Sequence, residues 1–109
     1  GIFNMETSTI SKTTRNYLAQ AEKAGKVRSG EFSTEKAVKS GKAGLVIVSE
    51  ESSDNTKKMF RNMCTYYKVP YFEFGNKEEL GHILGKQMRA SLAVIDPNFS
   101  EALLKHFAD

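Results

Sequence analysis

Side chains that could serve catalysis are few and scattered in this sequence. Cys64 is the only thiol, and its apolar neighbours at helical spacing predict a small buried side chain rather than a nucleophile. His82 and His106 fall inside predicted helices and in no recognisable nucleophile–base arrangement. The carboxylate pairs at 50–51 and 78–79 are typical of a turn and of a helix start. We expect no catalytic site, no metal site and no cofactor.

Two glycine-flanked basic segments are better candidates, and their chemistry is that of binding. Glycine lets the backbone approach a ligand closely, and the cations beside it suit phosphate. The second segment, residues 85–89, contributes Lys86, Gln87, Met88 and Arg89. The first, residues 25–34 with the lysines that follow, contributes Lys26, Arg28, Gly30, Glu31, Phe32, Ser33, Thr34, Lys36 and Lys39.

Gly30 and Phe32 are the two distinctive residues of the first segment. A glycine followed by a helix N-terminus presents unpaired N–H groups and a positive dipole end, which suits a phosphate. Phe32 is apolar in an otherwise polar stretch. Two hypotheses remain open for it: its ring packs inward, which apolar character favours, or it stacks on a nucleic-acid base.

Charge is distributed unevenly along the chain. The net charge is +3 and the isoelectric point is near 9.0. Residues 12–42 carry eight basic and three acidic side chains, whereas residues 43–109 carry eight and nine. A basic N-terminal third fits either an electrostatic footprint for a polyanion or a set of solvated helix faces.

The elements that must position these segments alternate along the chain. Apolar spacing and caps predict helices at 13–24, 33–40, 54–67, 76–85 and 98–107, with Ser33 or Thr34 capping the second. Strands are predicted at 27–29, 44–48, 71–74 and 91–95, and the short first one at a sheet edge. This order predicts an α/β fold, a three-layer α/β/α sandwich in which helices cover both faces of a central mixed sheet of about four strands.

Length and composition fit one domain without a membrane segment. The 109 residues include no apolar run near the roughly 20 that a membrane helix needs. Residues 1–11 lack periodicity, so we expect a flexible arm, in which Met5 raises the alternative that residues 1–4 are an expression remnant. Residues 12–109 then form one domain. With no secretory signal and one cysteine, we expect a cytoplasmic monomer.

Several segments together resemble the family of the archaeal ribosomal protein L-seven-Ae and its eukaryotic L-thirty-e relatives. They are residues 25–30 (GKVRSG) and 36–48 (KAVKSGKAGLVIV). Residues 55–58 (NTKK), 64–70 (CTYYKVP) and 80–86 (LGHILGK) are similar to the bacterial YlxQ-type branch. The segments occur in the right order, and the resemblance spans about residues 13–105.

The resemblance implies a fold, a function and a site. The family fold is a three-layer α/β/α sandwich, and its members bind RNA without catalysis, typically at kink-turns. It implies that the start of the second helix enters the RNA major groove at the kink. By position, the glycine at the helix entrance falls on Gly30, and the following threonine and lysine on Thr34 and Lys36. The loop that packs over bulged bases falls on residues 86–89.

One position departs from the family pattern. The Asn-Glu pair that reads guanine edges in archaeal members falls on Phe32 and Ser33. Phenylalanine offers only a stacking surface, and serine one short hydroxyl. Two functions therefore remain: a ribosome-associated module that binds structured RNA, such as ribosomal RNA or another kink-turn RNA, alongside ribosomal proteins, or a protein–protein interaction domain with weakened or lost RNA recognition. A nucleotide-binding enzyme is a third, which no motif favours.

Overall fold

A computed structural model describes residues 10–108 of the chain. Five helices and four strands alternate in it, as the sequence predicts: α1 (Lys12–Lys23), β2 (Val27–Ser29), α2 (Glu31–Lys39), β3 (Leu45–Val48), α3 (Asp54–Tyr67), β4 (Tyr71–Glu73), α4 (Lys77–Ile83), β5 (Ser91–Val94) and α5 (Pro97–Ala108). The predicted α/β/α class and the mixed four-stranded sheet are confirmed. Within residues 10–108, no helix has the length and apolar character to cross a bilayer.

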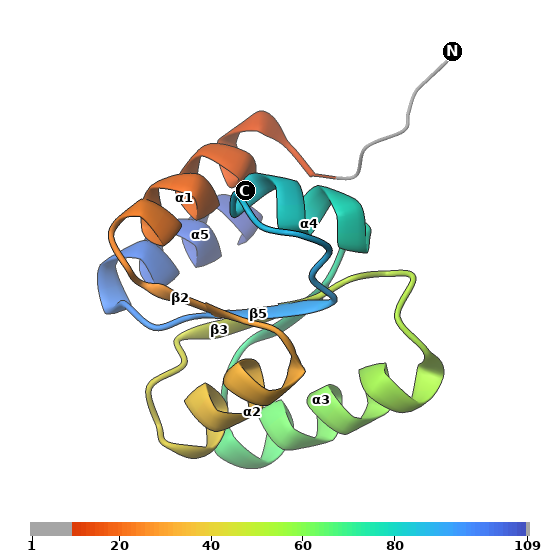
Figure 1. Cartoon of the computed structure of the whole chain (residues 1–109). Coiled ribbons are helices and arrows are strands. Elements are labelled where there is room, and N and C mark those ends of the chain that lie inside the picture. Colours follow the sequence, from red (N-terminus) through yellow and green to blue (C-terminus); the bar gives the residue numbers. More distant parts are fainter. Residues whose placement is uncertain (1–9, 109) are drawn as a thin grey trace.

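The sheet places the last strand in its interior. The strand order is β2-β5-β3-β4, so β2 lies at one edge, as predicted. β5 runs antiparallel to both β2 and β3, whereas β3 and β4 are parallel. Helices α1, α4 and α5 cover one face of the sheet, and α2 and α3 cover the other (Figure 1).

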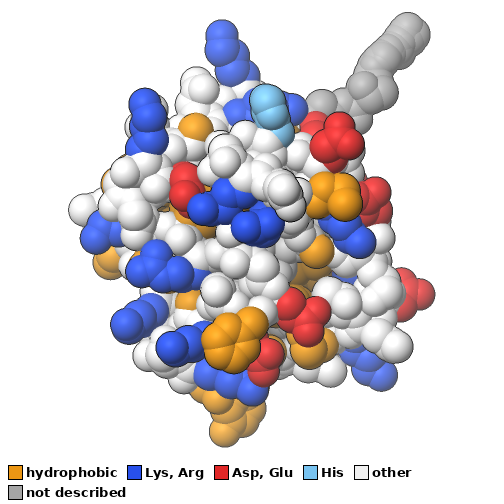
Figure 2. Space-filling model, viewed as in Figure 1, with side chains coloured by type: hydrophobic (Ala, Val, Ile, Leu, Met, Phe, Trp, Pro, Cys, Tyr) orange, Lys and Arg blue, Asp and Glu red, His pale blue; other side chains and the backbone are white. Residues whose placement is uncertain are grey.

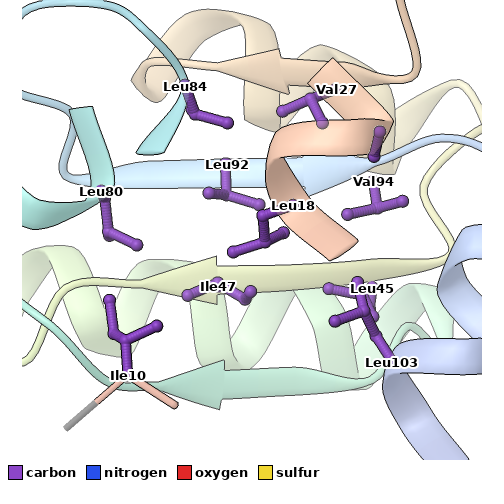
Figure 3. Packing of buried hydrophobic residues seen from close by; sticks show 11 residues of the cluster. Ile10, Leu18, Val27, Leu45, Ile47, Leu80, Leu84, Leu92, Val94 and Leu103 are labelled. Atoms are coloured by element: carbon purple, nitrogen blue, oxygen red, sulfur yellow. The ribbon is translucent and has the colours of Figure 1, made fainter. Parts of the chain in front are cut away.

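The apolar run of β3 is explained by this three-layer arrangement. All four of its residues are buried. Leu45 and Ile47 point into the core under α1, α4 and α5 (Figure 3), whereas Val46 and Val48 belong to the second core under α2 and α3. Alternate side chains of a strand point to opposite faces, so a strand buried on both faces must be apolar throughout.

Residues 10 and 11 belong to the folded domain, which corrects the C-terminal end of the arm expected at residues 1–11. Ile10 is 5% exposed and packs in the core, and Ser11 caps α1 by accepting a hydrogen bond from the Thr14 amide at 3.1 Å. The sequence pattern missed both residues because a single apolar side chain before a helix has no periodicity. The remainder of the predicted arm, residues 1–9, lies outside the described residues.

Helix α2 begins two residues earlier than predicted. Its N-cap is Gly30, and the Thr34 amide donates to the Gly30 carbonyl at 2.9 Å, which closes the first turn. Ser33 and Thr34 are therefore helical residues, and the prediction that one of them caps the helix was wrong. Gly30 has φ 94° and ψ 156°, a conformation essentially restricted to glycine, and this sharp turn leads the chain from β2 directly into the helix.

Helix α4 has the capping box that the sequence predicts. The Asn76 side chain accepts from the Glu79 amide at 2.8 Å, and the Glu79 carboxylate accepts from the Asn76 amide at 3.3 Å. This reciprocal pair fixes the start of α4, and Gly85 follows its end with φ 67°. The predicted loop at residues 86–89 then connects α4 to β5.

Candidate nucleic-acid interface

The structure brings the two glycine-flanked segments together, although about 60 residues separate them in the sequence. Ser29, the last residue of β2, pairs in register with Leu92 of β5, and the Gly30 amide donates to the Ser91 carbonyl at 3.0 Å. The start of α2 therefore lies beside the start of β5 and the loop that precedes it. Arg89 joins them directly, because its Nε donates to Ser29 Oγ at 3.1 Å.

The N-terminus of α2 is open to a ligand. The cap residue Gly30 has no side chain, so no side-chain oxygen caps the helix. Among the described residues, the amides of residues 31–33 have no intrahelical acceptor, because only the fourth amide closes the first turn. These N–H groups and the positive end of the helix dipole form a site suited to an anionic oxygen.

Phe32 is exposed, which makes the hypothesis of inward packing wrong. Its exposed fraction is 77%. Thr34, Ala37 and Val38 form the buried face of α2. Because each helical residue turns by about 100°, a side chain two positions before Thr34 points away from that face. The ring is thus available to stack on a ligand, and Ser33 beside it is half-buried.

Thr34 was predicted to contact RNA, but its side chain is buried and cannot reach a ligand directly. Its side chain is fully buried, and Ser91 Oγ donates to Thr34 Oγ1 at 3.3 Å. This buried hydroxyl pair links α2 to β5 under the candidate surface. Thr34 is therefore a supporting residue, and it leaves the set of predicted contacts.

Two of the predicted cations, Lys39 and Lys86, form ion pairs with carboxylates. Lys39 Nζ lies 2.7 Å from Glu35, which raises the pKa of the Lys39 amine chiefly through this hydrogen bond. Lys86 Nζ lies 3.6 Å from Glu22 on α1. These two lysines already have carboxylate partners, so a phosphate must compete for them.

Among the cations without a carboxylate partner in the described part of the chain, Arg28, Lys36 and Lys42 lie together. Arg28 donates through one guanidinium nitrogen to the carbonyls of Gly25 (3.2 Å) and Val27 (3.1 Å). All three cations line one groove between α2 and the edge strand β2, with a volume of about 260 Å³. The full lining is Arg28, Phe32, Ser33, Lys36, Ala37, Ser40, Lys42 and Ile95.

Lys42 is the site residue that sequence analysis missed. It was counted only in the basic third of the chain, because it follows the second predicted helix rather than preceding it. The turn at Gly41, with φ 77°, brings Lys42 back beside α2. The other predicted residues of this segment, Lys26 and Glu31, are exposed, but neither lines the groove.

The loop at residues 86–89 is held against α4. The Lys86 amide donates to the Gly81 carbonyl at 2.8 Å, and the Arg89 amide donates to the Lys77 carbonyl at 3.0 Å. Gly81 permits this packing, since a Cβ there would lie 2.7 Å from the Gln87 carbonyl carbon. Gln87 and Met88 are exposed at the loop tip, and Met88 is 64% exposed.

Basic and acidic side chains occupy different parts of the face that Figure 2 shows. Figure 2 shows basic side chains gathered over β2, α2 and the middle of the face, whereas acidic side chains lie mainly toward its right side. A hydrophobic side chain at the lower centre lies beside basic side chains on its left and acidic side chains on its right (Figure 2). Cations beside exposed apolar groups form a surface that suits phosphates and unstacked bases together.

The prediction that Cys64 is a small buried side chain is confirmed. Cys64 is 1% exposed on the inner face of α3, and burial raises the pKa of its thiol to about 11. Such a thiol is uncharged near neutral pH and is a poor nucleophile. His106 lies far along the chain from His82, with its Nε2 3.1 Å from the α1 cap hydroxyl of Ser11.

Relatives with curated names share most of this chain. It is 39% identical over 87 residues to the RNA-binding protein YlxQ of Bacillus subtilis, which covers 80% of this chain and 87% of that protein. It is 34% identical over 86 residues to the RNA-binding protein YlxQ of Enterococcus faecium, covering 79% and 82%.

Solved structures share the fold. A Bacillus halodurans protein of unknown function superposes with a TM-score of 0.83 at 33% identity, covering 87% of this chain and 96% of that chain. A 15.5 kD RNA binding protein of Giardia lamblia superposes with a TM-score of 0.74 at 20% identity, covering 84% and 82%. Residues 12–104 match the family model of the Ribosomal protein L7Ae/L30e/S12e/Gadd45 family, and the resemblance in the sequence is confirmed. The chain belongs to the Ribosomal protein L7Ae/L30e/S12e/Gadd45 family.

Proposed function

We propose that this protein is a non-catalytic, ribosome-associated RNA-binding module that recognises structured RNA, a kink-turn or another bulged element. The N-terminus of α2 and the loop at residues 86–89 form the binding surface. The Arg89–Ser29 hydrogen bond carries the proposal, because it joins these two segments into one continuous surface. The RNA-binding relatives in the same family support the partner class.

Different parts of this surface bind different parts of the RNA. The free amides at residues 31–33 and the unpaired cations Arg28 and Lys36 hold phosphates. Met88 and the loop backbone pack over bases that leave the helical stack. Phe32 and Ser33 provide a stacking surface and a hydroxyl where archaeal members have Asn and Glu. We therefore propose that stacking replaces much of the hydrogen-bond recognition of base edges.

A fluorescence anisotropy titration tests this function. The probe is a helix–bulge–helix RNA with tandem sheared G·A pairs, and the control is the fully paired duplex of the same length and composition, each at two salt concentrations. We expect tighter binding to the kinked RNA at both salts, because the bulge supplies unstacked bases that the duplex lacks. Equal, weak and strongly salt-dependent binding to both RNAs would reduce the site to a non-specific electrostatic footprint.

A protein–protein interaction domain is the second candidate function, and the exposure of apolar side chains favours it. Phe32 is 77% exposed and Tyr66 78% exposed, and a large exposed apolar side chain is a typical anchor at an interface. The test is a pull-down with ribosomal proteins after nuclease treatment, using wild type and Phe32→Ala. Capture that survives nuclease and is lost in the variant would favour this candidate over RNA binding.

A further inference from the structure

The groove between α2 and the edge of β2 has the size and chemistry of a site for one nucleotide. Its volume is about 260 Å³, and its lining includes three cations, two serine hydroxyls and one exposed aromatic ring. No carboxylate is among its lining residues. The three cations favour an anionic ligand over an apolar one. The aromatic ring favours a ligand with a planar group to stack on it over a free phosphate.

The charges in this groove are available to a ligand. Arg28, Lys36 and Lys42 have no carboxylate partner among residues 10–108, whereas Lys39 and Lys86 do. Three like charges around one cavity repel each other, so an anion that enters the cavity relieves that repulsion as well as gaining direct contacts. Arg28 is already oriented by its bonds to two backbone carbonyls, which lowers the entropic cost of using it.

Phe32 supplies the other half of a nucleotide site. Its ring lines the same groove as the cations yet is 77% exposed, so one of its faces is free for stacking. The helix that carries the ring is packed against the sheet, because Thr34, Ala37 and Val38 are buried.

We infer that this groove binds one unpaired nucleotide of the RNA, with its base on Phe32 and its phosphate between Arg28 and Lys42. The inference rests on the proposed function, since it names the element of the RNA that the α2 face takes. It assigns a binding role to Lys42 and a stacking role to Phe32. An unpaired nucleotide is favoured over a duplex because a base stacks on Phe32 only after it leaves its neighbours.

The first test measures whether one bulge base and the Phe32 ring depend on each other for binding. Each bulge nucleotide of the helix–bulge–helix RNA is replaced in turn by an abasic nucleotide, and affinities are measured for wild type, Phe32→Ala and Phe32→Tyr. We expect one position at which the abasic change weakens wild type and Phe32→Tyr by about fivefold or more and leaves Phe32→Ala unchanged. Kink-dependent binding in which no position couples to Phe32 would overturn the nucleotide site and leave the proposed function standing.

The second test needs no structured RNA. Adenosine 5′-monophosphate and ribose 5-phosphate are titrated into the isotope-labelled protein, and amide shifts are followed by NMR. We expect shifts at Phe32, Ser33, Ser40 and Lys42 that saturate at lower concentration with the nucleotide than with the sugar phosphate. Lys42→Gln should weaken both ligands, whereas Lys105→Gln on α5, the opposite layer, should change neither. Absence of groove shifts, or tighter binding of a polyglutamate peptide than of the nucleotide, would overturn the inference even if kinked RNA binds.

Discussion

Arg89 Nε donates to Ser29 Oγ at 3.1 Å, and this bond closes the gap between the loop before β5 and the turn that starts α2. The same guanidinium donates to the Met88 carbonyl at 3.0 Å. One side chain thus holds both the loop backbone and the strand end. A surface assembled from two distant segments needs such a connection, because each segment alone is a short, exposed stretch.

Loss of this bond should weaken RNA binding more than folding. Ser29→Ala removes only the acceptor and leaves every charge in place, so we expect about 2- to 10-fold weaker binding to the kinked RNA. Arg89→Lys keeps the charge but loses the planar donors, and should weaken binding to a similar extent. Anisotropy on both variants and on the double variant checks this: strictly additive losses would show that the two side chains do not act as a pair.

Paired and unpaired lysines should differ in salt dependence. Lys36→Gln removes a cation without a carboxylate partner, and we expect the slope of log affinity against log salt to fall by about one. Lys39→Gln removes a cation whose Nζ lies 2.7 Å from the Glu35 carboxylate. We therefore expect this variant to change the salt slope less than Lys36→Gln does. The two variants remove the same charge from the same helix, and equal slope changes would contradict the distinction.

Gly81→Ala should destabilise the protein although alanine is the better helix former. A Cβ at this position would lie 2.7 Å from the Gln87 carbonyl carbon and 3.0 Å from the Met88 Cα, so the loop must move. Helix propensity alone would stabilise by up to about 1 kcal/mol, whereas displacement of packed backbone typically costs about 1–3 kcal/mol. We expect a lower melting temperature together with weaker RNA binding. A raised melting temperature would show that the loop is not held as described.

Gly30→Ala should cost more stability than Gly25→Ala. An added Cβ meets nothing within 4 Å at either position, so the difference comes from the backbone alone. Gly30 has φ 94° and ψ 156°, a backbone conformation that residues other than glycine rarely adopt. We expect Gly30→Ala to lower the free energy of unfolding by about 1–3 kcal/mol. Gly25, with φ 73°, follows the end of α1 as a C′ glycine, where residues such as asparagine are also found. Urea denaturation of both variants measures the difference.

Acid should weaken the fold partly through Glu73. Hydrogen bonds from Tyr71 (2.7 Å) and Arg61 (3.0 Å) lower the pKa of the Glu73 carboxyl below its usual range. A lowered folded-state pKa stabilises the protein above the unfolded-state pKa, and this contribution is lost as pH falls through the folded value. Urea denaturation between about pH 6 and about pH 3 should therefore show a smaller loss of stability for Glu73→Gln than for wild type. Parallel profiles would exclude Glu73 from the acid response.

Local signals in the sequence determined the elements and their order. The apolar run at residues 44–48 predicted a strand buried on both faces, and β3 is buried throughout. Asn76 and Glu79 predicted a capping box, which the structure contains. These predictions succeed because caps and periodicity act over a few residues, and those residues are adjacent in the chain. The same reasoning placed residues 25–36 and 86–89 on the candidate surface.

Only the tertiary structure decided how those segments meet and which side chains face outward. Phe32 and Thr34 are two residues apart, yet one is 77% exposed and the other is fully buried. Which of the two side chains is buried depends on the residue at which α2 begins. The turn at Gly30 fixes that residue, because the Gly30 amide donates to the Ser91 carbonyl of β5. The turn at Gly41 places Lys42 in the groove beside α2. Ile10 packs in the core against Gly75. Such contacts link residues distant in the chain, so no local pattern of residue types specifies them.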